Sequence, residues 1–409
     1  MQPEFMQKND HCKPLTILIP ILDKKYELQA CLSNVAGLPL SRRVALMADK
    51  AGFGNLVIVT DVRQERLKKA LAGTGAQLTT TTHELQINHE PVLLLAPDCL
   101  PDRSFFVRLG EIQIGSDEML LWDDGQAILL GGHGSASLSH HLAHAHCFGQ
   151  LLSALGEAEQ PLQPRKSFHA LAGTSIRDAE DCRRAETMLL SGLVKATEGW
   201  MALHINRKIS LAVTSRLMHT AVTPNHMTWV SMILGLIGAA CFLSPAQSMQ
   251  IWGALFFLAH SILDGCDGEL ARLKFMESRL GGILDFWSDN VVHVSVFAAM
   301  GVGWAAASHD SVWPLLCAGL AVGGTAASAS LVYMHTMHAE KKSGPLYTSV
   351  STSKQKSAVV RIADILSRRD FIYLVLLLAL LGQTHWFLIM TAIGAPIYAL
   401  LLIGIMIRE

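Results

Sequence analysis

The feature that most constrains this chain is a series of apolar segments in its C-terminal half. Six runs follow one another, at residues 227–243, 251–263, 291–308, 312–333, 371–381 and 386–407. Several are shorter than the ~20 residues that a helix needs to cross the core of a bilayer, so flanking residues must extend them. Apolar residues make up 50% of the chain and charged residues 16%, whereas about 25% are charged in a typical soluble domain. We therefore expect an all-α domain of six transmembrane helices over residues 223–409.

The basic residues between these runs predict the orientation of the helices. Lysine and arginine occur before the first run, between the second and third, between the fourth and fifth, and at Arg408, and the other three loops contain neither. Because basic loops stay in the cytoplasm, we expect both termini there, in a multi-pass protein of the plasma (inner) membrane. Residues 1–22 lack a basic segment followed by a long apolar core, so no signal peptide is expected.

Four aspartates lie near membrane depth, around the end of the second run and the start of the third. They are Asp264, Asp267, Asp285 and Asp289. A carboxylate in the membrane is costly unless it is paired, hydrated or bound to metal. Helical spacing places the first two on one face of a helix and the last two on one face of the next. The short turn at residues 274–279 would make these helices antiparallel neighbours, so the two acidic faces are expected to meet.

Four facing carboxylates cannot all stay ionised without positive charge between them. Divalent cations with oxygen ligands supply that charge, and Mg²⁺ is the usual one where a phosphate shares the site. Gly268 and Gly281 remove side chains from the facing surfaces, and Arg272 adds a guanidinium that binds phosphate well. Solvated loop carboxylates are the alternative interpretation. The spacing favours a cation site that also binds a phosphate.

The spacing of these residues resembles the signature of the CDP-alcohol phosphotransferase family at every position. The matching string is Asp264-x2-Asp267-Gly268-x2-Ala271-Arg272-x8-Gly281-x3-Asp285-x3-Asp289. Pro224-Asn225-x2-Thr228 is similar to the start of that family's first transmembrane helix. The resemblance covers about residues 195–409. It implies transfer of a substituted phosphate from a CDP-alcohol to an acceptor alcohol, with release of CMP, in the synthesis of a phospholipid or a polyol phosphodiester.

The resemblance also implies roles for individual residues. Asp264, Asp267 and Asp285 would bind two divalent cations, Mg²⁺ or Mn²⁺, and Asp289 would contact metal or act as the general base. The CMP site would be lined by Asn225, Thr228, Gly268, Ala271, Arg272 and Gly281. A homodimer and contact with membrane lipid are further implications of the family. A net charge of −1 gives no reason to expect a nucleic-acid partner.

The identities of the donor and of the acceptor stay open. Arg361, Arg368 and Arg369, in the fourth loop, are candidates for binding an acceptor that carries a phosphate. The same residues are equally expected to set membrane topology and to contact anionic lipids. The donor is either CDP-diacylglycerol or a soluble CDP-polyol.

The front part of the chain has the pattern of an α/β domain, which we place at residues 1–175. Apolar runs at 15–22, 56–60 and 92–95 predict buried strands, and residues 41–51 have helical periodicity. Similarity to sugar-phosphate nucleotidyltransferases, which implies a Rossmann-like fold, is carried by Gly37-Leu38-Pro39-Leu40, Arg43 and Lys50-Ala51-Gly52. Asp98 follows a strand, where that family has an aspartate that holds the metal.

One segment departs from that family. The family has a glycine-rich loop after the first strand, where backbone amides hold a triphosphate. Here residues 22–27 are Leu-Asp-Lys-Lys-Tyr-Glu, and the next glycine is Gly37. Amides cannot wrap phosphates as closely without glycine, and the carboxylates of Asp23 and Glu27 repel phosphate. We therefore expect a degenerate, non-catalytic relative. The alternative is a bifunctional enzyme whose front domain makes the CDP-alcohol from CTP.

Residues 176–222 are expected to form a helical linker. It ends in a basic amphipathic helix after Asn206, which would lie in the plane of the membrane interface. The junction resembles that of fused enzymes in which an inositol-phosphate cytidylyltransferase is joined to a di-inositol-phosphate phosphate synthase. A plain soluble linker helix is the alternative.

Three remaining features favour structural roles. The histidine-rich stretch 133–146 contains His140 and His144 at a spacing that suits a transition metal, but solvated histidines are the favoured interpretation. Asp123-Asp124-Gly125 predicts a turn between strands. The eight cysteines form no CxxC pair and are expected to be reduced.

Two other functions are compatible with acids in a membrane. An ion-coupled transporter uses intramembrane carboxylates, but these four lie near one side, and no internal repeat relates the runs. A membrane scaffold that has lost catalysis is disfavoured by the intact set of acids. A membrane transferase is therefore the leading hypothesis.

Overall fold

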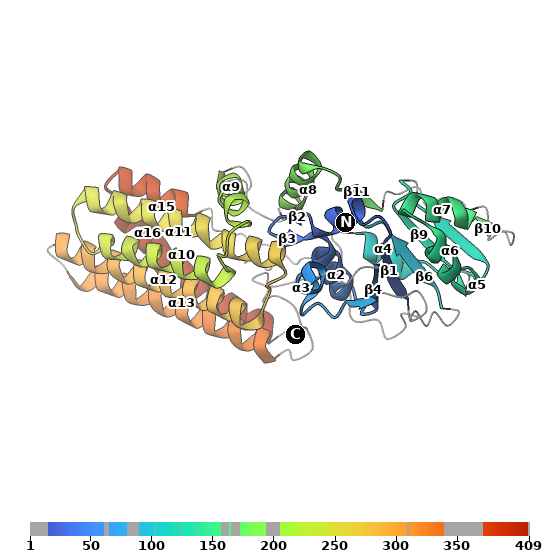
Figure 1. Cartoon of the computed structure of the whole chain (residues 1–409). Helices are drawn as coiled ribbons and strands as arrows, with labels where there is room; N and C mark the ends of the chain where they lie inside the picture. The colour runs from blue at the N-terminus through green and yellow to red at the C-terminus, as the bar shows by residue number, and fades with distance from the viewer. Residues whose placement is uncertain are drawn as a thin grey trace. The chain divides into compact units, whose positions relative to one another are not determined.

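The structure is a computed structural model. It describes residues 15–60, 65–79, 90–102, 104–122, 124–136, 138–156, 163–164, 172–193, 205–308, 311–338 and 371–407. The chain divides into two compact units, Met1–Leu189 and Leu190–Glu409, coloured blue to green and green to red in Figure 1.

The first unit is built on a seven-stranded mixed sheet with the order β10-β8-β9-β6-β1-β4-β5. Its strands are β1 (Thr16–Ile21), β4 (Leu56–Thr60), β5 (Gln77–Thr79), β6 (Val92–Leu95), β8 (Glu118–Leu121), β9 (Ala127–Leu130) and β10 (Gln163–Pro164). β1 pairs in parallel with β4 and β6, and these strands are buried along almost their whole length. Continuous apolar runs are typical of parallel strands covered on both faces. The three predicted strands and the α/β fold class are confirmed.

Eight helices of the described residues belong to this unit. They are α1 (Tyr26–Leu32), α2 (Leu40–Lys50), α3 (Glu65–Leu71), α4 (Phe105–Glu111), α5 (Gly132–Ala136), α6 (Leu138–His144), α7 (Phe148–Gly156) and α8 (Ala179–Ser191). Two short antiparallel pairs join β2 (Asn34–Val35) to β3 (Leu38–Pro39) and β7 (Cys99–Pro101) to β11 (Gly173–Ser175). The helix predicted at residues 41–51 is α2. Within the described residues, seven cysteines are free thiols, as expected.

The antiparallel half of the sheet was not predicted. β9 pairs antiparallel with both β6 and β8. The turn between β8 and β9 was predicted, and it is confirmed at Asp124 and Gly125, whereas Asp123 lies outside the described residues. The Asp124 Oδ1 atom accepts a hydrogen bond from the Gln126 amide at 3.1 Å, and Gly125 has a φ of 65°, which glycine adopts without strain.

The second unit is helical. Its described helices are α9 (Arg207–Leu217), α10 (Pro224–Phe242), α11 (Gln247–Lys274), α12 (Arg279–Ala307), α13 (Val312–His338), α15 (Phe371–Leu380) and α16 (Thr384–Met406). The last six coincide closely with the six predicted apolar runs, and α10, α11 and α12 are extended by the residues of the predicted motif. Residues 339–370, which include Arg361, Arg368 and Arg369, lie outside the described residues.

Four of these helices are long and apolar enough to cross a membrane. They are Pro224–Phe242, Arg279–Ala307, Val312–His335 and Thr384–Met406. α11 is 28 residues long, but its second half carries the charged residues of the motif. The described part of α15 has 10 residues. The helical class of the domain is therefore confirmed, and four of the six expected spans meet this criterion of length and composition.

Glycines allow α10 to approach its neighbours closely. A Cβ atom at Gly238 would lie 3.0 Å from the Gly253 carbonyl oxygen of α11, and the converse distance is also 3.0 Å. A Cβ atom at Gly235 would lie 2.5 Å from Val292 Cγ1 of α12. Small residues at such contacts are typical of helix packing in lipid. α10 is therefore the helix against which α11 and α12 pack. We call α11 and α12 the motif helices, because they carry the four aspartates.

The ends of the helices are fixed by specific residues. Thr223 and His226 form a capping box at the start of α10, with Pro224 in the first turn. α11 ends at Phe275, which has a left-handed φ of 56°, and the Ser278 Oγ atom caps α12 by accepting from the Gly281 amide at 3.0 Å. The Lys274 Nζ atom donates to the carbonyl oxygens of Leu217, Thr220 and Val222, at 3.4, 2.8 and 3.0 Å. These contacts set the turn between the two motif helices and the loop before α10.

Candidate active site

Three of the four predicted aspartates converge. Asp264 and Asp267 of α11 and Asp285 of α12 each offer a carboxylate oxygen, and these oxygens lie within 4.8 Å of one another. Asp264 and Asp267 are 4% and 6% exposed, and Asp285 is half-buried. Such a group of hard oxygen ligands suits Mg²⁺ or a similar divalent cation.

The two motif helices meet through side chains rather than through their backbones. Both α11 and α12 pack closely against α10, and close backbone contact between α11 and α12 is minor by comparison. The predicted meeting of the two acidic faces is confirmed for Asp264, Asp267 and Asp285. Glycines of α10 bring both helices to the same support, which is why the carboxylates reach each other across the space between them.

Asp267 is oriented by two hydrogen bonds. Thr228 of α10 donates from Oγ1 to Asp267 Oδ2 at 2.6 Å, and the Gly268 amide donates to Asp267 Oδ1 at 2.5 Å. Thr228, which the family resemblance assigns to the nucleotide site, thus contacts a carboxylate of the cation site. Hydrogen bonds to a ligand residue fix its rotamer and tune its affinity for metal.

The two glycines of the motif lie beside polar side chains. A Cβ atom at Gly268 would be 3.1 Å from Arg272 Nη1. A Cβ atom at Gly281 would be 2.9 Å from Ser278 Oγ and 3.3 Å from Asn225 Oδ1. The absence of side chains therefore lets Arg272 lie over Gly268 and lets Asn225 approach Gly281. Arg272 and both glycines are thus placed on the helices that carry the carboxylates, and Asn225 approaches them from α10.

Asp289 has a different environment from the other three. It does not belong to the group of converging carboxylates among the described residues. Its Oδ1 atom lies 3.3 Å from His260 Nε2 and 3.7 Å from His293 Nδ1. Sequence reasoning did not single out His260. The available signal was a histidine within an apolar run, which is costly in a membrane unless it has polar partners.

A buried carboxylate behind the motif was also missed. Glu269 of α11 is 0% exposed, and its carboxylate accepts from Ser210 Oγ at 2.7 Å and Thr214 Oγ1 at 2.6 Å. Arg207 Nη1 lies 2.5 Å from Glu269 Oε1. All three partners lie on α9. The polar side of the predicted amphipathic helix is therefore attached to the motif helix through one buried carboxylate.

The histidine-rich stretch shows no comparable group. His140 and His144 are exposed, with their rings stacked at 4.6 Å between centroids. Within the described residues, neither belongs to a set of three or more side chains able to hold a metal ion. The favoured interpretation as solvated histidines agrees with this arrangement.

A helical membrane domain with converging buried carboxylates, glycines and an arginine defines a candidate site for a divalent cation and a phosphate. The comparison with known families identifies the class of this domain. Residues 221–393 match the CDP-alcohol phosphatidyltransferase family.

Curated relatives carry related names. The chain is 40% identical over 144 residues to the bifunctional IPC transferase and DIPP synthase of Thermococcus kodakarensis, which is 35% of this chain and 32% of that protein. The protein of the same name from Rubrobacter xylanophilus is 35% identical over 158 residues, 38% of this chain and 35% of that protein. The phosphatidylinositol phosphate synthase of Corynebacterium glutamicum is 31% identical over 108 residues, 26% of this chain and 48% of that protein.

The family match bears out the resemblance carried by the motif. The alignments include proteins with the bifunctional name that the junction suggested. They span about a third of the length of the bifunctional relatives. The similarity to those relatives therefore concerns part of each protein.

Proposed function

We propose that this protein transfers the substituted phosphate of a CDP-alcohol to an acceptor alcohol and releases CMP. The observation that carries the proposal is the convergence of Asp264, Asp267 and Asp285 within a domain of the CDP-alcohol phosphatidyltransferase family. Transfer at a diphosphate depends on alignment and charge neutralisation more than on covalent chemistry. The family match also favours a transferase over an ion-coupled transporter.

We propose that the three converging aspartates hold two Mg²⁺ or Mn²⁺ ions. The donor set fits such ions because it consists of carboxylate oxygens within 4.8 Å of one another. Bound divalent cations would neutralise the charge of the diphosphate. Thr228 and the Gly268 amide support this role, since both hold the carboxylate of Asp267 in one orientation.

Helices α10, α11 and α12 supply the residues that would bind the nucleotide. Arg272, beside Gly268, offers a guanidinium to the diphosphate, and Asn225, beside Gly281, offers an amide. Ala271 completes this set as a small residue of α11. Asp289 stands outside the converging group and is proposed as the general base toward the acceptor hydroxyl. Arg361, Arg368 and Arg369 remain the proposed site for a phosphate on the acceptor.

The names of the relatives support an inositol-containing substrate. They include DIPP synthase and phosphatidylinositol phosphate synthase. Two donors agree with these names, CDP-diacylglycerol and CDP-inositol, and inositol phosphate is the acceptor that suits the arginines of the fourth loop. We further propose a homodimer in the plasma (inner) membrane, in contact with lipid and with both termini in the cytoplasm.

We propose that the front domain does not catalyse nucleotidyl transfer, because its own carboxylates occupy four amides of the segment 22–26. Glu27 Oε2 accepts from the amides of Leu22 and Asp23 at 2.7 and 2.9 Å. Asp23 Oδ1 accepts from the amides of Lys25 and Tyr26 at 2.7 and 3.0 Å. A triphosphate would need amides of this kind, and here they point at negative charge.

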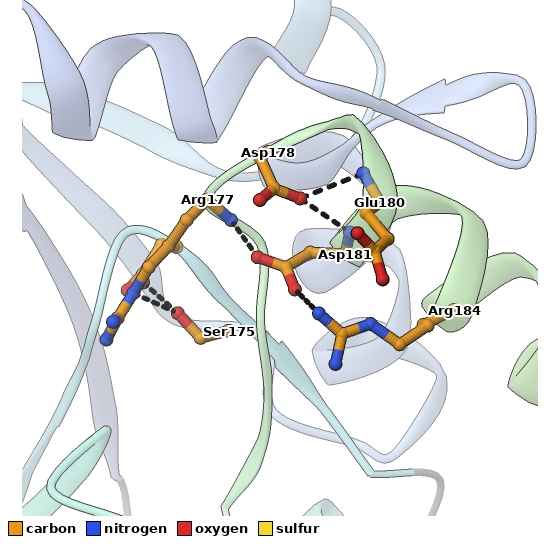
Figure 2. Close-up of polar contacts among 7 residues, drawn as sticks. Ser175, Arg177, Asp178, Glu180, Asp181 and Arg184 are labelled. Carbon is orange, nitrogen blue, oxygen red and sulfur yellow. Dashed lines mark hydrogen bonds and ion pairs between the residues drawn. The ribbon is translucent and has the colours of Figure 1, made fainter.

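The aspartate in the position of the metal ligand is paired as well. Ser175 Oγ donates to Asp98 Oδ2, and Arg177 Nε lies 3.5 Å from the same oxygen and 3.0 Å from Ser175 Oγ. Figure 2 shows Arg177 beside Ser175, with its amide donating to Asp181 at the start of α8. An internal cation is thus already paired with this carboxylate.

The bifunctional enzyme remains a second candidate function, because several relatives carry that name. Purified full-length protein in detergent, given CTP and inositol phosphate, would release pyrophosphate if this candidate holds.

The main proposal is tested with the same preparation. CDP-diacylglycerol and CDP-inositol are each combined with inositol phosphate, glycerol phosphate and unphosphorylated inositol, and CMP release is measured. We expect CMP release from at least one pair. Its absence with all pairs, from protein that unfolds cooperatively, would contradict the proposal.

A further inference from the structure

His260 is buried at the meeting point of three helices. It lies on α11, one turn before Asp264, and is 1% exposed. A buried imidazole is costly unless its ring nitrogens find polar partners. Its partners lie on the other two helices, and they connect it to the proposed base. The inference below rests on the proposed function, because it concerns that base.

The first partner of His260 is on α10. His260 Nδ1 lies 3.0 Å from the carbonyl oxygen of Ser231. A Cβ atom at Gly235 would lie 3.1 Å from His260 Cγ, so glycine at this position gives the ring room to reach the carbonyl. A carbonyl oxygen only accepts, and Nδ1 therefore carries a hydrogen.

The second partner is on α12. His260 Nε2 lies 3.3 Å from Asp289 Oδ1. Because Nδ1 already donates to Ser231, the contact with Asp289 is a hydrogen bond only if a second hydrogen lies between Nε2 and Oδ1. The ring of Phe257 lies nearly parallel to the imidazole, at 10° and 6.2 Å between centroids. The imidazole ring is thus held by the Ser231 carbonyl of α10 and by stacking on Phe257. These contacts fix the position of its Nε2 atom beside Asp289.

We propose that His260 is a positioning residue that holds one oxygen of Asp289 and thereby directs the other toward the acceptor. The acceptor oxygen forms a bond to the phosphorus that carries the donor's alcohol. The bond from that phosphorus to the bridging oxygen breaks, and CMP leaves with the bridging oxygen. The proton of the acceptor hydroxyl passes to Asp289 Oδ2. His260 acts only through Asp289 Oδ1 and touches neither substrate.

This role predicts a specific kinetic signature. Loss of His260 leaves Asp289 in the chain but removes the contact at 3.3 Å that holds its Oδ1 atom, so the transfer step slows while the donor still binds. A misplaced catalytic group costs up to about 10²-fold in rate. A purely structural role would instead lower stability and donor binding together.

The experiment compares full-length wild type with His260→Leu, His260→Gln and His385→Leu in detergent. Glutamine keeps an amide that can donate to Asp289, and leucine does not. His385, on α16, packs on Trp304 outside the site and serves as the matched control. CMP release gives kcat and KM, equilibrium binding gives the affinity for the CDP-alcohol, and thermal unfolding monitors the fold.

We expect kcat to fall about 10- to 100-fold in His260→Leu, with KM and donor affinity within about twofold of wild type. His260→Gln should recover most of that loss, and His385→Leu should match wild type. If the leucine variant does not fold, His260→Asn replaces it, because its short amide can still donate to the Ser231 carbonyl but does not extend to Asp289. A loss of kcat at unchanged donor affinity in this variant supports the inference, and wild-type kcat contradicts it.

Three results would overturn this inference and leave the proposed function intact. They are wild-type kcat in both His260 variants, equal losses of kcat in both variants, and a loss of donor affinity that matches the loss of kcat. A wild-type protein that releases no CMP overturns the proposed function, and this inference with it.

Discussion

Thr228 and Asp267 join two helices of the site by a hydrogen bond of 2.6 Å from Oγ1 to Oδ2. Thr228 is in the second turn of α10, which supports both motif helices, and Asp267 is a carboxylate of the converging group. Both residues are more than nine-tenths buried. The supporting helix therefore contributes directly to the orientation of a candidate metal ligand.

Replacing Thr228 should weaken metal use without abolishing the fold. In Thr228→Val the shape is kept but the donor to Asp267 is lost, and such outer contacts are typically worth about 10- to 100-fold in metal affinity or activity. We expect the Mg²⁺ concentration for half-maximal CMP release to rise by about tenfold or more. Thr228→Ser keeps the hydroxyl and serves as the control. Identical Mg²⁺ titrations for all three proteins would argue against this role.

Removal of divalent cations should stop the reaction. The three converging carboxylates have the hard oxygen ligands that such cations prefer. EDTA should abolish CMP release, and added Mg²⁺ or Mn²⁺ should restore it. Full activity in the presence of the chelator would contradict a metal-dependent transfer.

The four aspartates should separate into two kinetic classes. Asp289→Asn should lower kcat by about 10²- to 10⁴-fold, the usual contribution of a general base, and leave CDP-alcohol binding nearly intact. Asp264→Asn and Asp267→Asn should lose both turnover and binding, because these residues would hold the cations that neutralise the diphosphate. Binding and kcat are measured on the same preparations. Equal loss of donor affinity in all three variants would refute this division.

Loss of Glu269 should destabilise the membrane unit. Glu269→Ala removes the carboxylate that pairs with Arg207 and accepts from Ser210 and Thr214. Breaking a buried pair in this way typically costs about 3–5 kcal/mol. Thermal unfolding in detergent should therefore begin at a clearly lower temperature. Glu277→Ala, which removes an exposed carboxylate of the following turn, should unfold like wild type.

The front domain should release no pyrophosphate from CTP, even with Mg²⁺ and inositol phosphate present. The amides of Leu22, Asp23, Lys25 and Tyr26 are bonded to the carboxylates of Asp23 and Glu27. Asp98 is paired with Arg177. The assay uses the full chain, with CMP release from the membrane domain as the internal control for activity. CTP-dependent pyrophosphate release would favour the bifunctional enzyme instead.

Much of the site could be predicted because charge in a membrane is costly. Asp264, Asp267 and Asp285 stand out in an apolar context, and their spacing alone indicates which helix faces carry them. The three strands β1, β4 and β6 could be predicted equally well, because buried parallel strands form continuous apolar runs.

Contacts between distant segments could not be predicted in the same way. His260 and Ser231 meet only because α10 carries glycine at position 235, and Glu269 depends on three partners from α9. β8 has mixed burial, without a continuous apolar run, and the antiparallel half of the sheet was missed. The contact of α11 and α12 through side chains depends on their shared packing against α10, which spacing within each helix does not reveal.

The three carbonyl contacts of Lys274 have a consequence for biogenesis. The ribosome delivers residues 217–222 more than fifty residues before Lys274, so the connection between α9 and α10 is synthesised well ahead of the ammonium group that fastens it. This connection acquires its final form only after the second hydrophobic helix has left the translocon. The capped start of α10 can form at once, whereas the contacts that join Lys274 to the connection between α9 and α10 require that α11 has been synthesised.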